Sequence, residues 1–230
     1  MLIIADKRIP DEAKLNLQGI GEVLFLESEN IVYETISGHP DIFFCQVNNK
    51  LIIAPNLPAK YKLVLKKKNI EFEEGEENVG LKFPETAKYN VVATNNFLMH
   101  NFRYTDSKIL EHQGDLYPVH LNQGYSRCNL LPLKNDHFIT SDHGIYRILK
   151  NFKVNVLMVN PSDIILPGVK HGFFGGCCGV LHDTVFIIGS LSKFKDGEKV
   201  SEFLSASGYK IVELYNGPLF DGGSILFIDD

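Results

Sequence analysis

A short run of apolar residues, closed by a polar, small or proline residue, recurs along the chain. The copies occupy residues 2–6, 51–55, 97–101, 138–142 and 186–190. Their starts lie 41 to 49 residues apart, and about 46 residues also separate the last copy from the first when the count continues through the C-terminus. A near-constant period of this length is the signature of a repeated structural unit. We therefore expect five similar units.

Four of these runs are preceded by a second apolar run and a turn. The preceding runs are residues 42–47, 89–93, 130–133 and 179–181. Asn and Asp are frequent in the connecting residues, and both tolerate the positive φ of tight hairpin turns. The pattern predicts a β-hairpin in each of these units. The first unit lacks its leading strand, and we expect the apolar residues 224–230 to pair with residues 2–6 and close a ring.

A helical stretch and a further strand follow the hairpins. Residues 197–207 have helical character, Gly208 ends them, and an apolar strand pattern covers 209–214. Residues 59–68 and 70–73 repeat this order in an earlier unit. Each unit is therefore interpreted as β-β-α-β. The alternative is an α+β domain in which the spacing is a coincidence.

Composition narrows the class of protein. The 230 residues are 44% apolar and 22% charged, and we expect one domain over 1–230. A net charge of −5 gives no electrostatic footprint for duplex nucleic acid, so no nucleic-acid partner is expected. The N-terminal residues do not resemble a signal peptide, and no apolar run is long enough to span a membrane. The four cysteines form no CxxC pair and no secreted disulfide framework, which predicts a cytoplasmic protein. The sequence does not indicate an oligomeric state.

Five β-β-α-β units in a ring resemble the pentein fold of guanidino-group-modifying enzymes. That superfamily includes arginine deiminases, dimethylarginine dimethylaminohydrolases, agmatine deiminases and amidinotransferases. Residues 175–190, 208–214 and 221–225 are similar to its closing segment, and residues 39–46 are similar to its substrate strand. The resemblance implies an α/β fold, a five-bladed propeller of pseudo-fivefold symmetry, with a site at its central channel. The resemblance is evidence for the fold more than for the chemistry.

The sequence departs from the superfamily at the catalytic positions. The nucleophilic cysteine that the resemblance places shortly after the terminal Gly-Gly is replaced by Leu226 and Phe227. The general-acid histidine would fall at residues 127–129, which read Arg-Cys-Asn, and the carboxylates that grip a guanidinium would fall near the uncharged residues 45–46. Deiminase or amidinotransferase chemistry is therefore not expected. Whether the chain is an enzyme at all stays open.

Polar and small residues still gather at one level of the expected channel, if the first strand of each hairpin lines it. The candidate ligand-binding residues are Asp41, Gln46, Cys128, Asn129, Gly176, Asp221, Gly222, Gly223 and Ser224. The glycines would let the backbone approach a ligand closely, and their amides could hold an anion.

The candidate catalytic residues are Cys177, Cys178 and His39. Adjacent strand residues point to opposite faces, so one of the two cysteines should face the channel. A nucleophilic thiol needs a base or a positive neighbour, for which Arg127 or His39 stands at a suitable position. The alternative is that both cysteines are small buried apolar residues. A metal site from Cys128, Cys177 and a histidine matches no known ligand spacing, so no metal and no cofactor are expected.

Two functions remain. The first is binding of a small amino-acid-like or guanidino ligand at the channel mouth, by a binding protein or by a divergent hydrolase that lacks the usual cysteine. The second is a non-catalytic protein-interaction role, as a pseudoenzyme of the same fold. A deep central pocket favours the first, and a filled channel with an exposed apolar face favours the second.

Overall fold

The computed structural model describes residues 1–228, and their strands form five three-stranded sheets of one topology. In each sheet the first strand is antiparallel to the middle strand, and the third strand is parallel to it. The sheets are β15 (Leu226–Ile228), β1 (Leu2–Asp6) and β2 (Glu22–Leu26); β3 (Phe44–Val47), β4 (Lys50–Ile53) and β5 (Glu73–Glu74); β6 (Val92–Ala93), β7 (Phe97–His100) and β8 (Tyr117–His120); β9 (Leu130–Leu133), β10 (His137–Thr140) and β11 (Asn155–Met158); and β12 (Cys178–Leu181), β13 (Thr184–Ile187) and β14 (Lys210–Glu213). The predicted five-unit repeat is confirmed at the level of these sheets.

A helix connects the middle strand to the third strand in each sheet. These helices are α1 (Asp11–Gln18), α3 (Ala59–Lys67), α4 (Ser107–Glu111), α6 (His143–Leu149) and α7 (Gly197–Ala206). Short 3-10 turns lie at η1 (Glu34–Ile36), η2 (Glu85–Ala87), η3 (Lys134–Asp136), η4 (Pro161–Asp163), η5 (Gly175–Cys177) and η6 (Leu191–Lys193). The predicted helix at 197–207 is confirmed to within one residue, and Gly208 follows it with a φ of 73°.

Three helical turns precede the first strands, where the sequence predicts strand or loop. They are α2 (Pro40–Phe43), α5 (Ser126–Asn129) and η5. Pro40 suits the first position of a helical turn because its φ is fixed and it needs no amide partner. The predicted strand at 42–47 therefore begins two residues later, at Phe44.

The placement of both cysteines on one strand is wrong. The amide of Cys177 donates to the carbonyl of Phe174 at 3.1 Å, so Cys177 closes a helical turn, whereas Cys178 begins β12. The strand alternation expected for this pair does not apply.

The predicted hairpin turns use the residues that tolerate left-handed backbone. Asn48 and Asn49 have φ of 45° and 61°, Asn135 and Asp136 have 58° and 54°, and His182 has 51°. A two-residue loop with positive φ matches the twist of the strands that it joins. These turns fix the registers of the hairpins.

The C-terminal strand pairs with the N-terminal one. β15 runs antiparallel to β1, with Leu2 opposite Ile228 and Ile4 opposite Leu226. This pairing is the one the sequence predicts, although residues 229 and 230 of the predicted strand lie outside the described residues. A side-chain amide also connects the first and second units, because Nε2 of Gln46 donates to the carbonyl of Phe227 at 3.1 Å.

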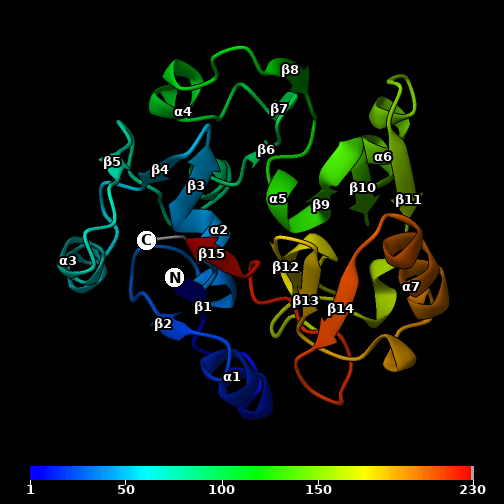
Figure 1. The fold of residues 1–230 in the computed structure, drawn as a ribbon. Helices are drawn as coiled ribbons and strands as arrows, with labels where there is room; N and C mark the ends of the chain where they lie inside the picture. Colours follow the sequence, from blue (N-terminus) through cyan, green and yellow to red (C-terminus); the bar gives the residue numbers. More distant parts are fainter. Residues whose placement is uncertain (229–230) are drawn as a thin grey trace.

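Figure 1 shows the sheets around a common centre. The first strands β3, β6, β9, β12 and β15 lie on the inside, and the connecting helices lie at the periphery. The middle strands lie between these two layers and are largely buried, as β1 is over its whole length. Across residues 1–228, every helix is too short or too polar to span a lipid bilayer.

Candidate functional site

A buried cluster of polar side chains lies at the inner ends of the first strands. α2 contributes Asp41 and its preceding residue His39, α5 contributes Cys128, and the C-terminal Gly-Gly turn is followed by Ser224. Each of these four residues is at most 4% exposed. The amide of Asp41 donates to the carbonyl of Gly223 at 3.1 Å, which fixes α2 against that turn.

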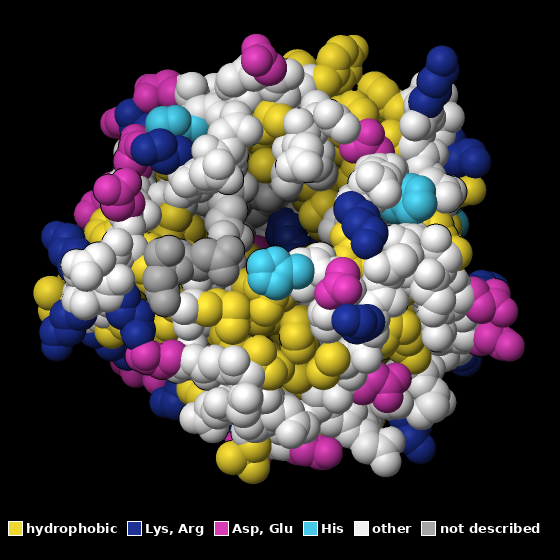
Figure 2. All heavy atoms as spheres, in the orientation of Figure 1, with side chains coloured by type: hydrophobic (Ala, Val, Ile, Leu, Met, Phe, Trp, Pro, Cys, Tyr) yellow, Lys and Arg dark blue, Asp and Glu magenta, His cyan; other side chains and the backbone are white. Residues whose placement is uncertain are grey.

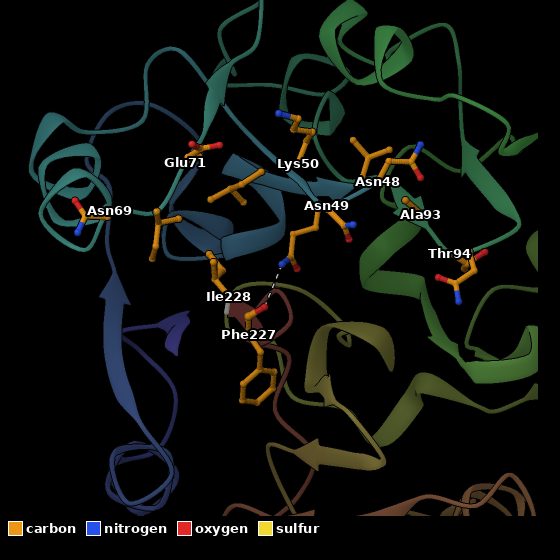
Figure 3. Close-up of a pocket in the computed structure, with 14 residues that line it drawn as sticks. Asn48, Asn49, Lys50, Asn69, Glu71, Ala93, Thr94, Phe227 and Ile228 are labelled. Atoms are coloured by element: carbon orange, nitrogen blue, oxygen red, sulfur yellow. Dashed lines mark hydrogen bonds between the residues drawn. The ribbon is translucent and has the colours of Figure 1, made fainter. Parts of the chain in front are cut away.

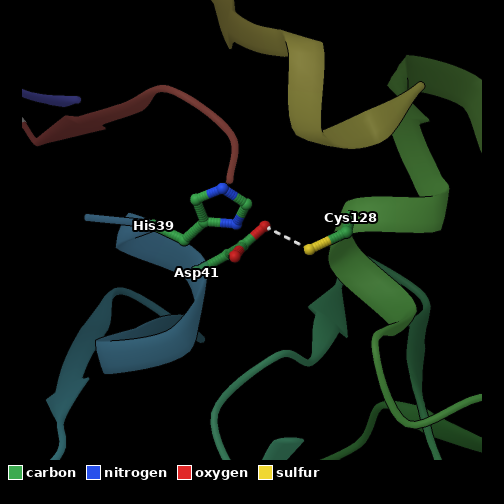
Figure 4. A group of neighbouring side chains, drawn as sticks. All are labelled: His39, Asp41 and Cys128. Atoms are coloured by element: carbon green, nitrogen blue, oxygen red, sulfur yellow. Dashed lines mark hydrogen bonds between the residues drawn. The ribbon is translucent and has the colours of Figure 1, made fainter. Parts of the chain in front are cut away.

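The carboxyl of Asp41 is the centre of the cluster. Its Oδ2 accepts from the thiol of Cys128 at 3.0 Å and from the hydroxyl of Ser224 at 2.9 Å. Figure 4 shows the thiol and the imidazole of His39 both turned toward this carboxyl. Among the described residues, Oδ1 of Asp41 and both ring nitrogens of His39 are buried without a hydrogen-bond partner. Buried polar atoms nearly always have partners, so these three call for a functional explanation.

Asn90 holds the cluster together and is a residue that the sequence analysis missed. Its Nδ2 lies 3.2 Å from the Asp41 carbonyl and 3.2 Å from the thiol of Cys128, and its Oδ1 accepts from the Arg127 amide at 2.7 Å. Asn90 lies seven residues before the apolar run at 97–101, whereas Asp41 and Cys128 each lie ten residues before theirs, so a comparison of the units at constant spacing does not reveal it.

Asp221 lies beside this cluster. Its carboxyl accepts from the amides of Gly223 at 3.0 Å and Phe173 at 2.8 Å. Burial raises the pKa of Asp221 to about 6, against the opposing charge of His39. Asp221 therefore gains or loses its proton more readily near neutral pH than an ordinary aspartate does.

The glycines at this level make room for side chains of the chain itself. A Cβ on Gly176 would lie 1.9 Å from Oδ1 of Asp221, and a Cβ on Gly223 would lie 2.2 Å from Cβ of His39. Gly222 faces Ile9 at a similar distance of 2.8 Å. The side chains of Asp221 and His39 thus lie directly against Gly176 and Gly223, which the sequence analysis expected to contact a ligand.

The two adjacent cysteines belong to an apolar core cluster that also contains residues of β12, β13 and α7. The thiol of Cys177 donates to the Phe173 carbonyl at 3.3 Å. Burial raises the pKa of Cys178 to about 12 and that of Cys177 well above its ordinary value. A nucleophile needs the thiolate, and this environment favours the neutral thiol in both. The geometry therefore supports the apolar reading of the pair.

Two further predicted residues have structural contacts. Asn129 is buried, and its Nδ2 donates to the Tyr125 carbonyl at 2.9 Å. Gln46 lies exposed at the outer end of β3, where its amide reaches β15.

A central channel connects the cluster to the surface. Its volume is about 160 Å³, and first strands from every sheet described above contribute to its wall. The lining residues are Asp41, Phe44, Cys45, Gln46, Val91, Ala93, Arg127, Pro132, Val180, Ile225, Leu226 and Phe227. Figure 2 shows this face hollowed at its centre, with basic side-chain atoms at the floor of the hollow.

Arg127 gives the channel its positive charge. Its guanidinium is half-buried and one nitrogen donates to the Gly175 carbonyl at 3.2 Å. Burial lowers the pKa of Arg127, while the charge of Asp41 raises it. An arginine still stays protonated at neutral pH, so a cation and a buried carboxyl line one small cavity.

A wider hollow of about 940 Å³ opens outside the channel (Figure 3). The β3–β4 turn at Asn48 and Asn49 lies on one side of it, and Phe227 and Ile228 lie on another. It shares Gln46, Ala93 and Phe227 with the channel wall, so the two hollows meet at these residues. The wider hollow is lined by strand and loop residues in equal numbers and lies outside the channel.

The comparison with protein families assigns the chain to one family. A family of unknown function, DUF6873, matches residues 4–226. The chain belongs to that family. A search of curated proteins finds no match to this DUF6873 member.

Three solved structures illustrate the likeness of fold. An amidinotransferase of saxitoxin biosynthesis from Microseira wollei has a TM-score of 0.58 at 12% identity, covering 99% of this chain and 94% of that one. DDAH from Pseudomonas aeruginosa, in complex with citrulline, has 0.53 at 10% identity, covering 92% and 91%. An agmatine deiminase from C. jejuni has 0.54 at 12% identity, covering 95% and 78%.

These likenesses confirm the resemblance to the pentein superfamily at the level of fold. At such low identity they show the fold alone, so the chemistry of this DUF6873 member has to be inferred from its own residues. Leu226, which stands where the resemblance places the nucleophile, lies in β15 and lines the channel with an apolar side chain.

Proposed function

We propose that the chain binds a small amino-acid-like or guanidino ligand in the central channel, without amidino-transfer chemistry. The observation that carries this proposal is the pair of Arg127 and Asp41 on the wall of one cavity. The cavity of about 160 Å³ is close to the roughly 150 Å³ that an engineered protein cavity needs to hold benzene. Its size therefore suits a compact molecule of amino-acid size.

The two charges match the two ends of such a ligand. A guanidinium presents a fork of donors that binds a carboxylate through two hydrogen bonds, so Arg127 would hold the acidic end. The buried Oδ1 of Asp41, which lacks a partner, would accept from an ammonium or guanidinium group at the other end. Apolar residues such as Phe44 and Val180 would pack on the ligand between them.

The fold supports this location. We infer that the sheets form the blades of a five-bladed α/β propeller with pseudo-fivefold symmetry, closed where β15 pairs with β1. The hydrogen bond from Gln46 to Phe227 supports closure on the inside, because it joins the first strand of one unit to that of its neighbour. In such a ring the channel is the place where every blade can contribute a contact.

Arg127 provides the test. Thermal unfolding of the wild-type protein is measured with arginine, citrulline, agmatine, methylarginines and other amino acids. A ligand at a hundred times its Kd should stabilise the folded chain by about 2.7 kcal/mol, so a saturable rise in Tm is expected for at least one carboxylate-bearing compound. Arg127→Gln should remove that rise because it removes the charge.

Arg103→Gln is the matched control, since Arg103 is an exposed arginine away from the channel. It should keep the full rise in Tm. An absence of any shift in the wild type, or an equal shift in Arg127→Gln, would contradict the proposal. The first of these results would favour the protein-interaction alternative.

A further inference from the structure

We propose that His39, Asp41 and Cys128 form a binding site for a divalent transition metal, with Zn²⁺ the preferred ion. This goes beyond the ligand site, because a metal can bind whether or not the channel holds an organic molecule. One potential ligand atom from each residue lies within 4.8 Å of the others. Zinc binds nitrogen, oxygen and sulfur at about 2.0–2.3 Å, which places neighbouring ligand atoms roughly 3–4 Å apart. The Sγ of Cys128 and Oδ2 of Asp41 already lie 3.0 Å apart.

The unpartnered atoms of the cluster favour the binding of a cation there. Oδ1 of Asp41 and both nitrogens of His39 are buried without hydrogen-bond partners among the described residues. A buried polar atom left without a partner destabilises the folded state. A metal at the centre of the cluster would coordinate a ring nitrogen of His39 and Oδ2 of Asp41, which leaves Oδ1 of Asp41 for the channel ligand.

Surrounding groups already orient the three candidate ligands. Nε2 of His39 lies 3.9 Å from Oδ2 of Asp6, which leaves Nδ1 to face the metal, and Figure 4 shows the ring edge turned toward Asp41. A carboxylate behind a metal-bound histidine is a common arrangement that fixes the ring. The hydroxyl of Ser224 donates to Asp41, and the side-chain amide of Asn90 contacts the thiol of Cys128. Asp41 and Cys128 therefore each have a polar neighbour beside the proposed metal position.

The charges of the site suit a dication. In the metal-free cluster the thiol proton of Cys128 lies between sulfur and the carboxyl of Asp41. On binding, the sulfur–hydrogen bond breaks, the proton leaves to solvent, and the sulfur electron pair forms the bond to the metal. One carboxylate and one thiolate then balance the charge of the ion.

The mixture of ligands selects the ion. Thiolate and imidazole favour zinc and similar transition metals, whereas Mg²⁺ and Ca²⁺ prefer oxygen ligands. Three protein ligands leave a fourth position, as in zinc sites that bind water or a substrate. Asp41 also lines the channel, which places the site at the channel's inner end.

The test is metal titration of the full chain after treatment with a chelator, with no organic ligand present. Calorimetry should show one Zn²⁺ per chain and no binding of Mg²⁺. Co²⁺ should give a thiolate-to-metal charge-transfer band in the near ultraviolet. Cys128→Ser should lose this band, and His39→Gln should weaken Zn²⁺ affinity at least tenfold.

Cys177→Ser is the matched control, because Cys177 is an equally buried thiol outside the group. It should keep both the band and the stoichiometry. The wild-type Co²⁺ spectrum tests the site even where a variant fails to fold, because a spectrum without a thiolate band overturns the proposal. A band that persists in folded Cys128→Ser overturns it too. Neither result bears on the channel ligand, which the Tm screen tests separately.

Discussion

Two glycines let polar side chains pack directly against the backbone at the cluster. Gly176 faces the carboxyl of Asp221, and Gly223 faces His39 with a φ of 66°. Any side chain at Gly176 would displace a carboxyl that accepts two backbone amides. The close approach of Asp221 and His39 therefore favours glycine at both positions.

Gly176→Ala should destabilise the protein by at least about 2 kcal/mol, because the new methyl group would overlap Oδ1 of Asp221. Urea denaturation measures the change. Gly19→Ala is the control, since Gly19 has a φ of −72° and its nearest neighbour would lie 3.4 Å from the new Cβ. That variant should change stability by less than about 1 kcal/mol. Equal effects at the two positions would show that the close approach is unimportant.

A buried histidine far from the channel predicts acid sensitivity. The ring of His100 lies 2.7 Å from Oγ1 of Thr105 and 2.7 Å from the Gly124 carbonyl, and burial lowers its pKa to about 4. The unfolded chain binds this proton near the ordinary pKa of about 6.5. His100 therefore stabilises the fold fully above pH 6.5, and this contribution is lost as the pH falls toward 4.

Between pH 7 and pH 4.5 that loss amounts to about 2 kcal/mol of unfolding free energy. His100→Gln should show a decline smaller by about this amount when urea denaturation is measured at both pH values. His143→Gln, at an exposed position, should decline like the wild type. Asp221 opposes His100 over the same interval, but it is present in all three proteins and cancels in the comparison. An unchanged decline in His100→Gln would refute the assignment.

Individual residues were predictable where local backbone chemistry decides them. Asn48, Asn49 and Asn135 were placed in turns because Asn tolerates positive φ, and all three adopt it. The orphaned atoms of His39 were not predictable, because a sequence does not show which buried group finds a partner. Asn90 was missed because it lies closer in sequence to its middle strand than Asp41 and Cys128 do to theirs.

At the scale of elements, β15 is bonded to one sheet and packed against another. Its backbone pairs with β1, while the ring of Phe227 lies 5.0 Å from that of Phe186 in β13. Ile3, Ala5 and Ile188 complete the same apolar cluster. The C-terminal strand thus connects the first and last units of the chain.

Phe227→Ala should cost about 3 kcal/mol, the usual loss when a buried phenylalanine leaves a cavity. Its side chain is at most about a tenth exposed, and its contacts bridge two units. Chemical denaturation gives the value, and Leu15→Ala in α1 is the control because Leu15 is 68% exposed. The control should stay within about 0.5 kcal/mol of the wild type. A neutral Phe227→Ala would mean that β15 adds little to the fold.

Strand order was predictable because the apolar runs repeat, and the helical turns α2, α5 and η5 were not. Each of these segments has only three or four residues, which is too short for a helical period to show in the sequence. The consequence reaches the site, because Asp41, Cys128 and Cys177 all lie in these turns. The strand alternation used for the two cysteines therefore failed.

At the scale of the whole molecule, this chain shares its fold with known enzymes but differs from them in the residues expected to carry the chemistry. The same architecture serves an amidinotransferase, DDAH and an agmatine deiminase, yet here Leu226 lines the channel and the thiols of Cys45 and Cys178 have pKa values raised to about 12 by burial. What the channel retains is a cation, Arg127, and a buried carboxyl, Asp41. These features support binding more than covalent catalysis.

The most direct measurement is a crystal structure of the chain with the compound that raises its Tm most. We predict density for that compound in the central channel, with a carboxylate on the guanidinium of Arg127 and its other polar end toward Asp41. Density confined to the outer hollow around Asn49 and Glu71, with an empty channel, would contradict the account.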